Sequence, residues 1–134
     1  MTQGWECLNM LPLFHIAGVF RTQIALLAGG TVLIGGGFDA AHFCRLVSSR
    51  RVAYFAASPT MFQAILQAAV TLGMVRGEMQ VGVVESVGSA LTHSLALEVR
   101  DWLAARVVTG YAMTECQPVT CPPFDDPLGT PGSA

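Results

Sequence analysis

The stretch Val107–Glu115, with the sequence V-V-T-G-Y-A-M-T-E, indicates both a fold class and a site. The β-branched run Val107–Thr109 predicts a buried strand, and a glycine ends it. Tyr111, Thr114 and Glu115 then follow, and ligands of open parallel sheets bind just beyond the carboxyl ends of strands. A tyrosine ring can stack on a base, a hydroxyl can donate to a phosphate, and a carboxylate can hold Mg²⁺. The stretch therefore predicts a site for a nucleotide and its metal, with an ordinary polar loop as the alternative.

Upstream of this stretch, short apolar strands alternate with amphipathic helical patterns. Asp39, Ser58 and Thr92 are suitable N-cap residues, and Glu85 interrupts an otherwise apolar strand. The predicted strands are 7–11, 31–34, 52–56, 81–87 and 107–109, and the predicted helices are 19–27, 40–49, 60–72 and 92–105. The proline-rich sequence after Glu115 predicts a loop. The alternation predicts an α/β fold with a mainly parallel sheet, right-handed crossovers and flanking helices.

Parallel strands end at one edge of a sheet, so the loops 14–15, 58–60, 88–90 and 111–115 are expected to line one cleft. Gly88, Ser89 and Ala90 would let a flat ligand approach the backbone closely, although a tight strand-to-helix turn has the same composition. His15 could orient a carboxylate or gate a pocket, and the alternative is a structural histidine.

The composition is unusually apolar for a chain of 134 residues. Hydrophobic residues make up 52%, charged residues make up 12%, and the mean hydropathy is +0.53. The charged share is about half of the usual ~25%. Such a composition fits a sheet buried on both faces. It also fits the interior part of a larger protein, and we favour this second interpretation because a small independent domain should carry more charge.

Charge and cysteine usage narrow the function classes. The net charge is −2 and the only adjacent basic pair is Arg50-Arg51, which argues against nucleic-acid binding. Four scattered cysteines and no recognisable signal peptide predict free thiols and a cytoplasmic protein. The uncharged run 53–75 raises the alternative of a membrane span. Polar residues and Pro59 interrupt it, however, so a strand followed by a helix is the better prediction.

Four segments, in order, resemble the AMP-forming adenylating enzymes, a family that includes acyl-CoA and aryl-CoA synthetases, peptide-synthetase adenylation domains and luciferases. Leu11–Gly18 resembles the family's PLFHxxG segment, and Ser86–Thr92 resembles its adenine-side loop. Gly110–Glu115 resembles YGMTE, with alanine at Ala112 in place of glycine. Gly132–Ala134 resembles the start of the PGSVG segment. The resemblance covers nearly the whole chain.

The resemblance implies a reaction in two steps. A carboxylic acid attacks the α-phosphate of ATP to give an acyl-adenylate, and CoA or a carrier pantetheine thiol then accepts the acyl group. By resemblance, the loop of Gly88, Ser89 and Ala90 borders the adenine of ATP or AMP. Tyr111 packs on the adenine, Thr114 contacts the phosphate and Glu115 holds Mg²⁺. His15 lies near the carboxylate, and Thr114, Glu115 and His15 are the expected catalytic residues.

The family's phosphate loop, which ends in Lys-Gly, is not found in these 134 residues, and neither is its C-terminal domain with the catalytic lysine. Residues 1–134 therefore resemble part of the large AMP-binding domain, and the missing segments or a partner chain are expected to be needed for activity. A cytoplasmic location is expected, and the family also admits a peroxisomal one. The alternative is a non-catalytic remnant or interaction module that retains part of the nucleotide cleft.

Overall fold

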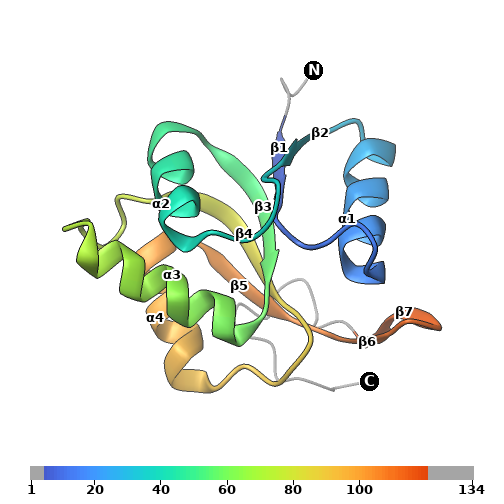
Figure 1. Cartoon of the computed structure of the whole chain (residues 1–134). Helices are drawn as coiled ribbons and strands as arrows, with labels where there is room; N and C mark the ends of the chain where they lie inside the picture. The colour runs from blue at the N-terminus through green and yellow to red at the C-terminus, as the bar shows by residue number, and fades with distance from the viewer. Residues whose placement is uncertain (1–4, 121–134) are drawn as a thin grey trace.

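The computed structural model describes residues 5–120, which form a five-stranded sheet with four helices and a terminal hairpin (Figure 1). The elements are, in chain order, β1 (Glu6–Asn9), α1 (Ile16–Leu27), β2 (Thr31–Ile34), α2 (Ala40–Ser49), β3 (Val52–Ala57), α3 (Pro59–Thr71), β4 (Val81–Ser86), α4 (His93–Leu103), β5 (Arg106–Thr109), β6 (Tyr111–Met113) and β7 (Cys116–Thr120). The predicted α/β fold with a mainly parallel sheet is confirmed.

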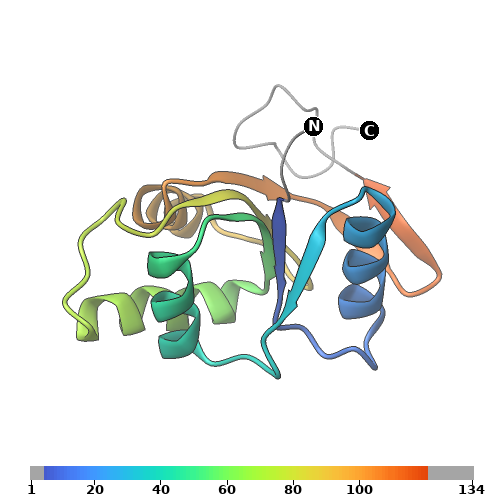
Figure 2. The same ribbon diagram turned by 90° about the horizontal axis from the view of Figure 1, so that it is seen from above.

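The sheet has the strand order β2-β1-β3-β4-β5, and every pairing in it is parallel. Figure 2 shows α1 and the hairpin on one side of the sheet and α2, α3 and α4 on the other. Neighbouring β4 and β5 are in register from Val83↔Arg106 to Ser86↔Thr109. The carboxyl ends of the strands consequently lie at one edge of the sheet, as the alternating pattern predicted.

The predicted N-caps explain why three of the helices start where they do. The side chain of Asp39 accepts a hydrogen bond from the backbone N–H of His42 at 2.6 Å. Ser58 accepts from Met61 at 3.3 Å and is followed by a proline in the first helical turn. Thr92 accepts from Leu95 at 3.4 Å. Each cap satisfies a backbone donor that the helix itself leaves unpaired.

The hydrophobic core lies between the sheet and helices α2, α3 and α4. Phe43, Phe55 and Phe62 are fully buried there. The ring centroids of Phe43 and Phe55 are 4.5 Å apart, and those of Phe55 and Phe62 are 6.4 Å apart with the planes nearly perpendicular. These aromatic contacts join α2, β3 and α3 on this face of the sheet.

Two predictions about local structure were wrong. Helix α1 begins at Ile16 rather than Val19, because the side chain of His15 caps it. The chain after Glu115 is not a loop throughout, since β7 pairs antiparallel with β6 as far as Thr120. Proline is tolerated at Pro118 because both strands of a two-stranded hairpin are edge strands, where a missing N–H breaks fewer sheet hydrogen bonds.

Candidate functional site

The carboxyl edge of the sheet brings together most of the loops that the sequence singled out. His15 follows β1, Gly88–Ala90 follow β4, and Tyr111 follows β5. Because Ser86 and Thr109 are paired on adjacent strands, Gly88 and Tyr111 each lie two residues beyond the same level of the sheet. The two segments expected to contact a nucleotide base therefore leave the sheet side by side.

The loop after β4 has an open surface. Gly88, Ser89 and Ala90 are exposed, and Gly88 has φ +86°, a left-handed conformation that residues with a side chain adopt only under strain. A Cβ atom on Gly88 would meet nothing within 4 Å, so the backbone is accessible at this position. The loop is thus a surface that a planar group can approach.

The hairpin carries Tyr111, Thr114 and Glu115. The side chain of Tyr111 is 56% exposed, and its backbone N–H donates to Oγ1 of Thr120 at 3.3 Å. Thr114 and Glu115 are exposed and occupy the turn between β6 and β7. They therefore do not follow the end of β5 directly, as the sequence suggested, but lie at the tip of a hairpin that projects from the sheet in Figure 1.

His15 has a structural contact in addition to its place at the sheet edge. Its Nδ1 atom accepts a hydrogen bond from the backbone N–H of Ala17 at 3.1 Å, which caps α1. The imidazole is exposed, so the ring lies at the surface where β1 gives way to α1. His15 can cap the helix and contact a ligand at the same time, because only its Nδ1 atom takes part in the capping hydrogen bond.

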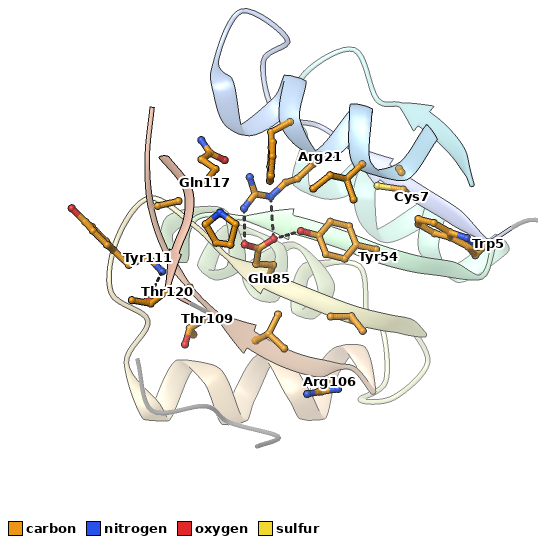
Figure 3. Close-up of a pocket in the computed structure, with 18 residues that line it drawn as sticks. Trp5, Cys7, Arg21, Tyr54, Glu85, Arg106, Thr109, Tyr111, Gln117 and Thr120 are labelled. Atoms are coloured by element: carbon orange, nitrogen blue, oxygen red, sulfur yellow. Dashed lines mark hydrogen bonds and ion pairs between the residues drawn. The ribbon is translucent and has the colours of Figure 1, made fainter. Parts of the chain in front are cut away.

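A cavity of about 390 Å³ lies over the sheet face that α1 and the hairpin flank (Figure 3). Its walls are predominantly apolar and come from the segment before β1 and from β1, α1, β3, β4, β5, β6 and β7. Gly110 and Tyr111 line it at the carboxyl edge, and Trp5 and Arg106 line it toward the opposite ends of the strands. No local sequence pattern indicates this cavity, because its walls come from many separate segments.

A polar cluster crosses this cavity. The Nε atom of Arg21 donates to Oε2 of Glu85 at 3.1 Å, and its Nη2 atom donates to Oε1 at 2.6 Å. The hydroxyl of Tyr54 donates to Oε2 of Glu85 through a short hydrogen bond. Figure 3 shows the three side chains converging from α1, β3 and β4. The only sequence signal was the acidic Glu85 inside an apolar strand.

The cluster fixes the charge states of two of its members. Burial by itself would lower the pKa of Arg21, but Tyr54 and Glu85 raise it above its ordinary value. Burial, reinforced by the Glu85 carboxylate, raises the pKa of Tyr54 well above its ordinary range. Arg21 is therefore a permanent cation and Tyr54 remains a hydrogen-bond donor at neutral pH.

Cys7 also lines the cavity, and ionisation of its thiol should lower the stability of the fold at alkaline pH. Burial raises the pKa of its thiol from 9.0 to about 11. The stability that the neutral thiol contributes is fully present below pH 9 and is lost as the pH rises through about 11, by about 3 kcal/mol in all. In urea unfolding, we expect the difference in unfolding free energy between the wild-type chain and Cys7→Ala to shrink by about 2 kcal/mol between pH 8 and pH 11, because half of the native thiol is still neutral at pH 11. The exposed Cys116→Ala is the control, and a pH-independent difference for Cys7→Ala would contradict the expectation.

Within residues 5–120, His, Cys, Asp and Glu side chains form no cluster of three or more that could bind a metal ion. Over the same range, every helix is too short or too polar to cross a bilayer.

Comparison with known sequences identifies one family. The family model described as AMP-binding enzyme matches residues 1–134. Comparison with curated proteins finds no match.

Solved structures share the fold. ATP-bound MatB from Rhodopseudomonas palustris superposes with a TM-score of 0.76 at 23% identity, over 94% of this chain and 25% of that one. A Mycobacterium tuberculosis fatty acyl CoA synthetase gives 0.72 at 23% identity, over 84% and 22%. The Bacillus subtilis O-succinylbenzoate coenzyme A synthetase MenE, in complex with ATP and magnesium, gives 0.70 at 23% identity, over 86% and 23%. The chain thus spans about a quarter of the length of these structures.

Proposed function

Because the chain belongs to the AMP-binding enzyme family, we propose that it is part of an ATP-dependent ligase that activates a carboxylic acid. The acid's carboxylate attacks the α-phosphate of ATP, pyrophosphate leaves, and an acyl-adenylate forms. A thiol, either CoA or a carrier pantetheine, then takes the acyl group and releases AMP. The observation that carries the proposal is the adjacency of the β4 and β5 exits, since Ser86 pairs with Thr109 and Gly88 and Tyr111 each follow two residues later.

The proposed nucleotide contacts follow from this placement. Tyr111 would pack its exposed ring on the adenine, and the open backbone of Gly88, Ser89 and Ala90 would border the base from the neighbouring strand exit. His15, at the exit of β1, would orient the carboxylate of the acid. These contacts use only side chains and backbone that are accessible at the carboxyl edge.

The proposed phosphate contacts lie on the hairpin turn. The hydroxyl of Thr114 would donate to a phosphate oxygen, and the carboxylate of Glu115 would hold Mg²⁺. A single exposed carboxylate fits Mg²⁺ in this setting, because the ion commonly takes one or two carboxylates, substrate phosphates and water. The bound ion would supply charge neutralisation on the phosphates, and Thr114 would add a fixed donor where negative charge develops.

Nucleotide binding by the chain tests these roles directly. We expect Tyr111→Ala to weaken binding of ATP-Mg about tenfold in calorimetry, since base–aromatic stacking contributes about 1–3 kcal/mol. We expect the ATP affinity of the wild-type chain to depend on Mg²⁺, and Glu115→Ala should remove this dependence. Glu98→Ala, an exposed acid on α4, is the matched control and should leave both quantities unchanged. Unaltered ATP binding in Tyr111→Ala and Glu115→Ala would contradict the assignment.

Catalysis is tested in a longer polypeptide that joins this chain to the segments its relatives carry. Such a polypeptide should exchange pyrophosphate into ATP when a carboxylic acid is present. Glu115→Ala should reduce the exchange below detection, because the phosphates would lose their metal. Exchange at the wild-type rate in Glu115→Ala would rule out the proposed role of this carboxylate.

A second candidate function is a non-catalytic interaction module. It is favoured by large apolar side chains that are exposed around α1, among them Phe14 at 94% and Leu27 at 87%. Such side chains usually mark a surface that another part of a protein covers. A chain that is folded and monomeric in solution and binds ATP-Mg would argue against this second candidate.

A further inference from the structure

We propose that the Arg21–Glu85 ion pair sets the far limit of an acid-binding pocket, which therefore admits a short, uncharged acyl or aryl group. This inference rests on the proposed function, which brings the reacting carboxylate to the carboxyl edge of the sheet. It adds a substrate class to that function and names the residues that select it.

The cavity and the candidate nucleotide site share one residue. Tyr111 belongs to both, and Gly110 lines the cavity beside it. From this end the cavity extends along the sheet face toward Trp5 and Arg106 (Figure 3). An acid whose carboxylate meets the α-phosphate near Tyr111 would therefore direct the rest of its structure along the strands and under α1.

The ion pair lies across this path. Glu85 is the next-to-last residue of β4 and pairs in register with Val108, so the barrier lies close to the carboxyl edge. Arg21 reaches it from α1 and is only 9% exposed. Each partner makes one further hydrogen bond. The Tyr54 hydroxyl donates to Glu85, and Nη1 of Arg21 donates to the carbonyl oxygen of Ala17 at 3.3 Å. A long chain that continued toward Trp5 would have to pass these bonded side chains.

The charges in the cavity select a neutral group. The carboxylate of Glu85 already neutralises the charge of Arg21. A second carboxylate on the substrate would therefore be repelled by Glu85 and would find no uncompensated cation at the ion pair. An ammonium group would likewise meet Arg21. Burying either charge without a partner is unfavourable, whereas the apolar walls favour hydrocarbon. Even the whole cavity, with the part beyond the ion pair, holds only about 390 Å³, near the lower end of the roughly 300–1,000 Å³ of ligand pockets. The part on the Tyr111 side of the ion pair is smaller still.

Calorimetric titration with each acid provides the readout. We expect butanoate and benzoate to bind at least tenfold more tightly than octanoate or succinate. Arg21→Leu/Glu85→Ala removes the barrier while leaving no unpaired charge, and it should improve octanoate relative to butanoate at least tenfold. Replacing a buried ion pair by apolar residues is often neutral for folding, so circular dichroism should report a folded variant.

The matched control is the surface pair of Arg50 and Glu6, whose charged atoms are 3.0 Å apart. Arg50→Leu/Glu6→Ala removes an arginine–glutamate pair outside the cavity and should leave the ratio of butanoate to octanoate affinity unchanged. An unchanged ratio in Arg21→Leu/Glu85→Ala would overturn the proposal. The failure of all four acids to bind the wild-type chain would overturn it as well.

A second measurement covers the case in which the double variant does not fold. In the wild-type chain, the terminal methyl group of bound butanoate should show nuclear Overhauser contacts to the Tyr54 ring or the Arg21 side chain, and their absence overturns the proposal.

Titration with ATP-Mg separates the two proposals. ATP binding without the expected acid selectivity contradicts this inference alone, and acid selectivity without ATP binding contradicts the nucleotide site alone.

Discussion

Replacing Glu85 with alanine should lower the free energy of unfolding by about 3–5 kcal/mol, because it leaves the Arg21 guanidinium without its counter-charge in a largely apolar cavity. The substitution removes the two hydrogen bonds that Arg21 donates to Glu85 and the acceptor of the Tyr54 hydroxyl. Urea unfolding at pH 7, followed by circular dichroism, measures the effect.

Two controls distinguish the cost of leaving Arg21 buried and unpaired from the cost of losing side-chain contacts. Arg21→Leu/Glu85→Ala should recover most of the lost stability, since it removes the unpaired cation as well. Glu6→Ala breaks the surface pair with Arg50, which is 52% exposed, and should cost less than about 1 kcal/mol. If Glu85→Ala and Glu6→Ala lower the free energy of unfolding by the same amount, the Arg21–Glu85 pair behaves like a solvent-exposed ion pair.

Replacing Phe55 with alanine should cost about 3–5 kcal/mol. Phe55 is fully buried in β3 and contacts the rings of Phe43 and Phe62, so the substitution leaves a cavity between the sheet and two helices. Urea unfolding again measures the loss, and the surrounding rings limit how far the site can collapse.

The matched control for Phe55 is Phe38, a phenylalanine that is 36% exposed to solvent. Phe38→Ala removes the same atoms from a partly solvated position and should cost about 1 kcal/mol or less. Equal costs at the two positions would show that the core does not depend on the contacts between Phe43, Phe55 and Phe62.

The fold was largely predictable because its signals are local. The caps Asp39, Ser58 and Thr92 mark helix starts within one turn, and β-branched runs mark strands such as β2. Strand–helix alternation then restricts the sheet to a parallel arrangement. The hairpin was missed because the pairing of β6 with β7 depends on cross-strand contacts, which outweighed the local signal of Pro118.

The candidate site was predictable only in part, for the same reason. The placement of Gly88 and Tyr111 at one edge follows from topology, which the alternating pattern determines. The polar cluster does not follow from topology, because Arg21 and Glu85 are 64 residues apart in the sequence and meet only in the folded chain. The roles of His15, Thr114 and Glu115 stay predictions until the binding experiments are done.

The strand order also determines where additional chain can enter the sheet. Within residues 5–120, β2 is hydrogen-bonded to β1 alone, so its outer side offers a row of peptide groups along a lateral margin. A strand from a longer polypeptide could join that margin without breaking any existing ladder, whereas insertion between β3 and β4 would require the sheet to come apart. The cavity lies over β1, β3, β4 and β5 and not over β2, so such growth would enlarge the domain and leave the walls of the proposed acid pocket in place.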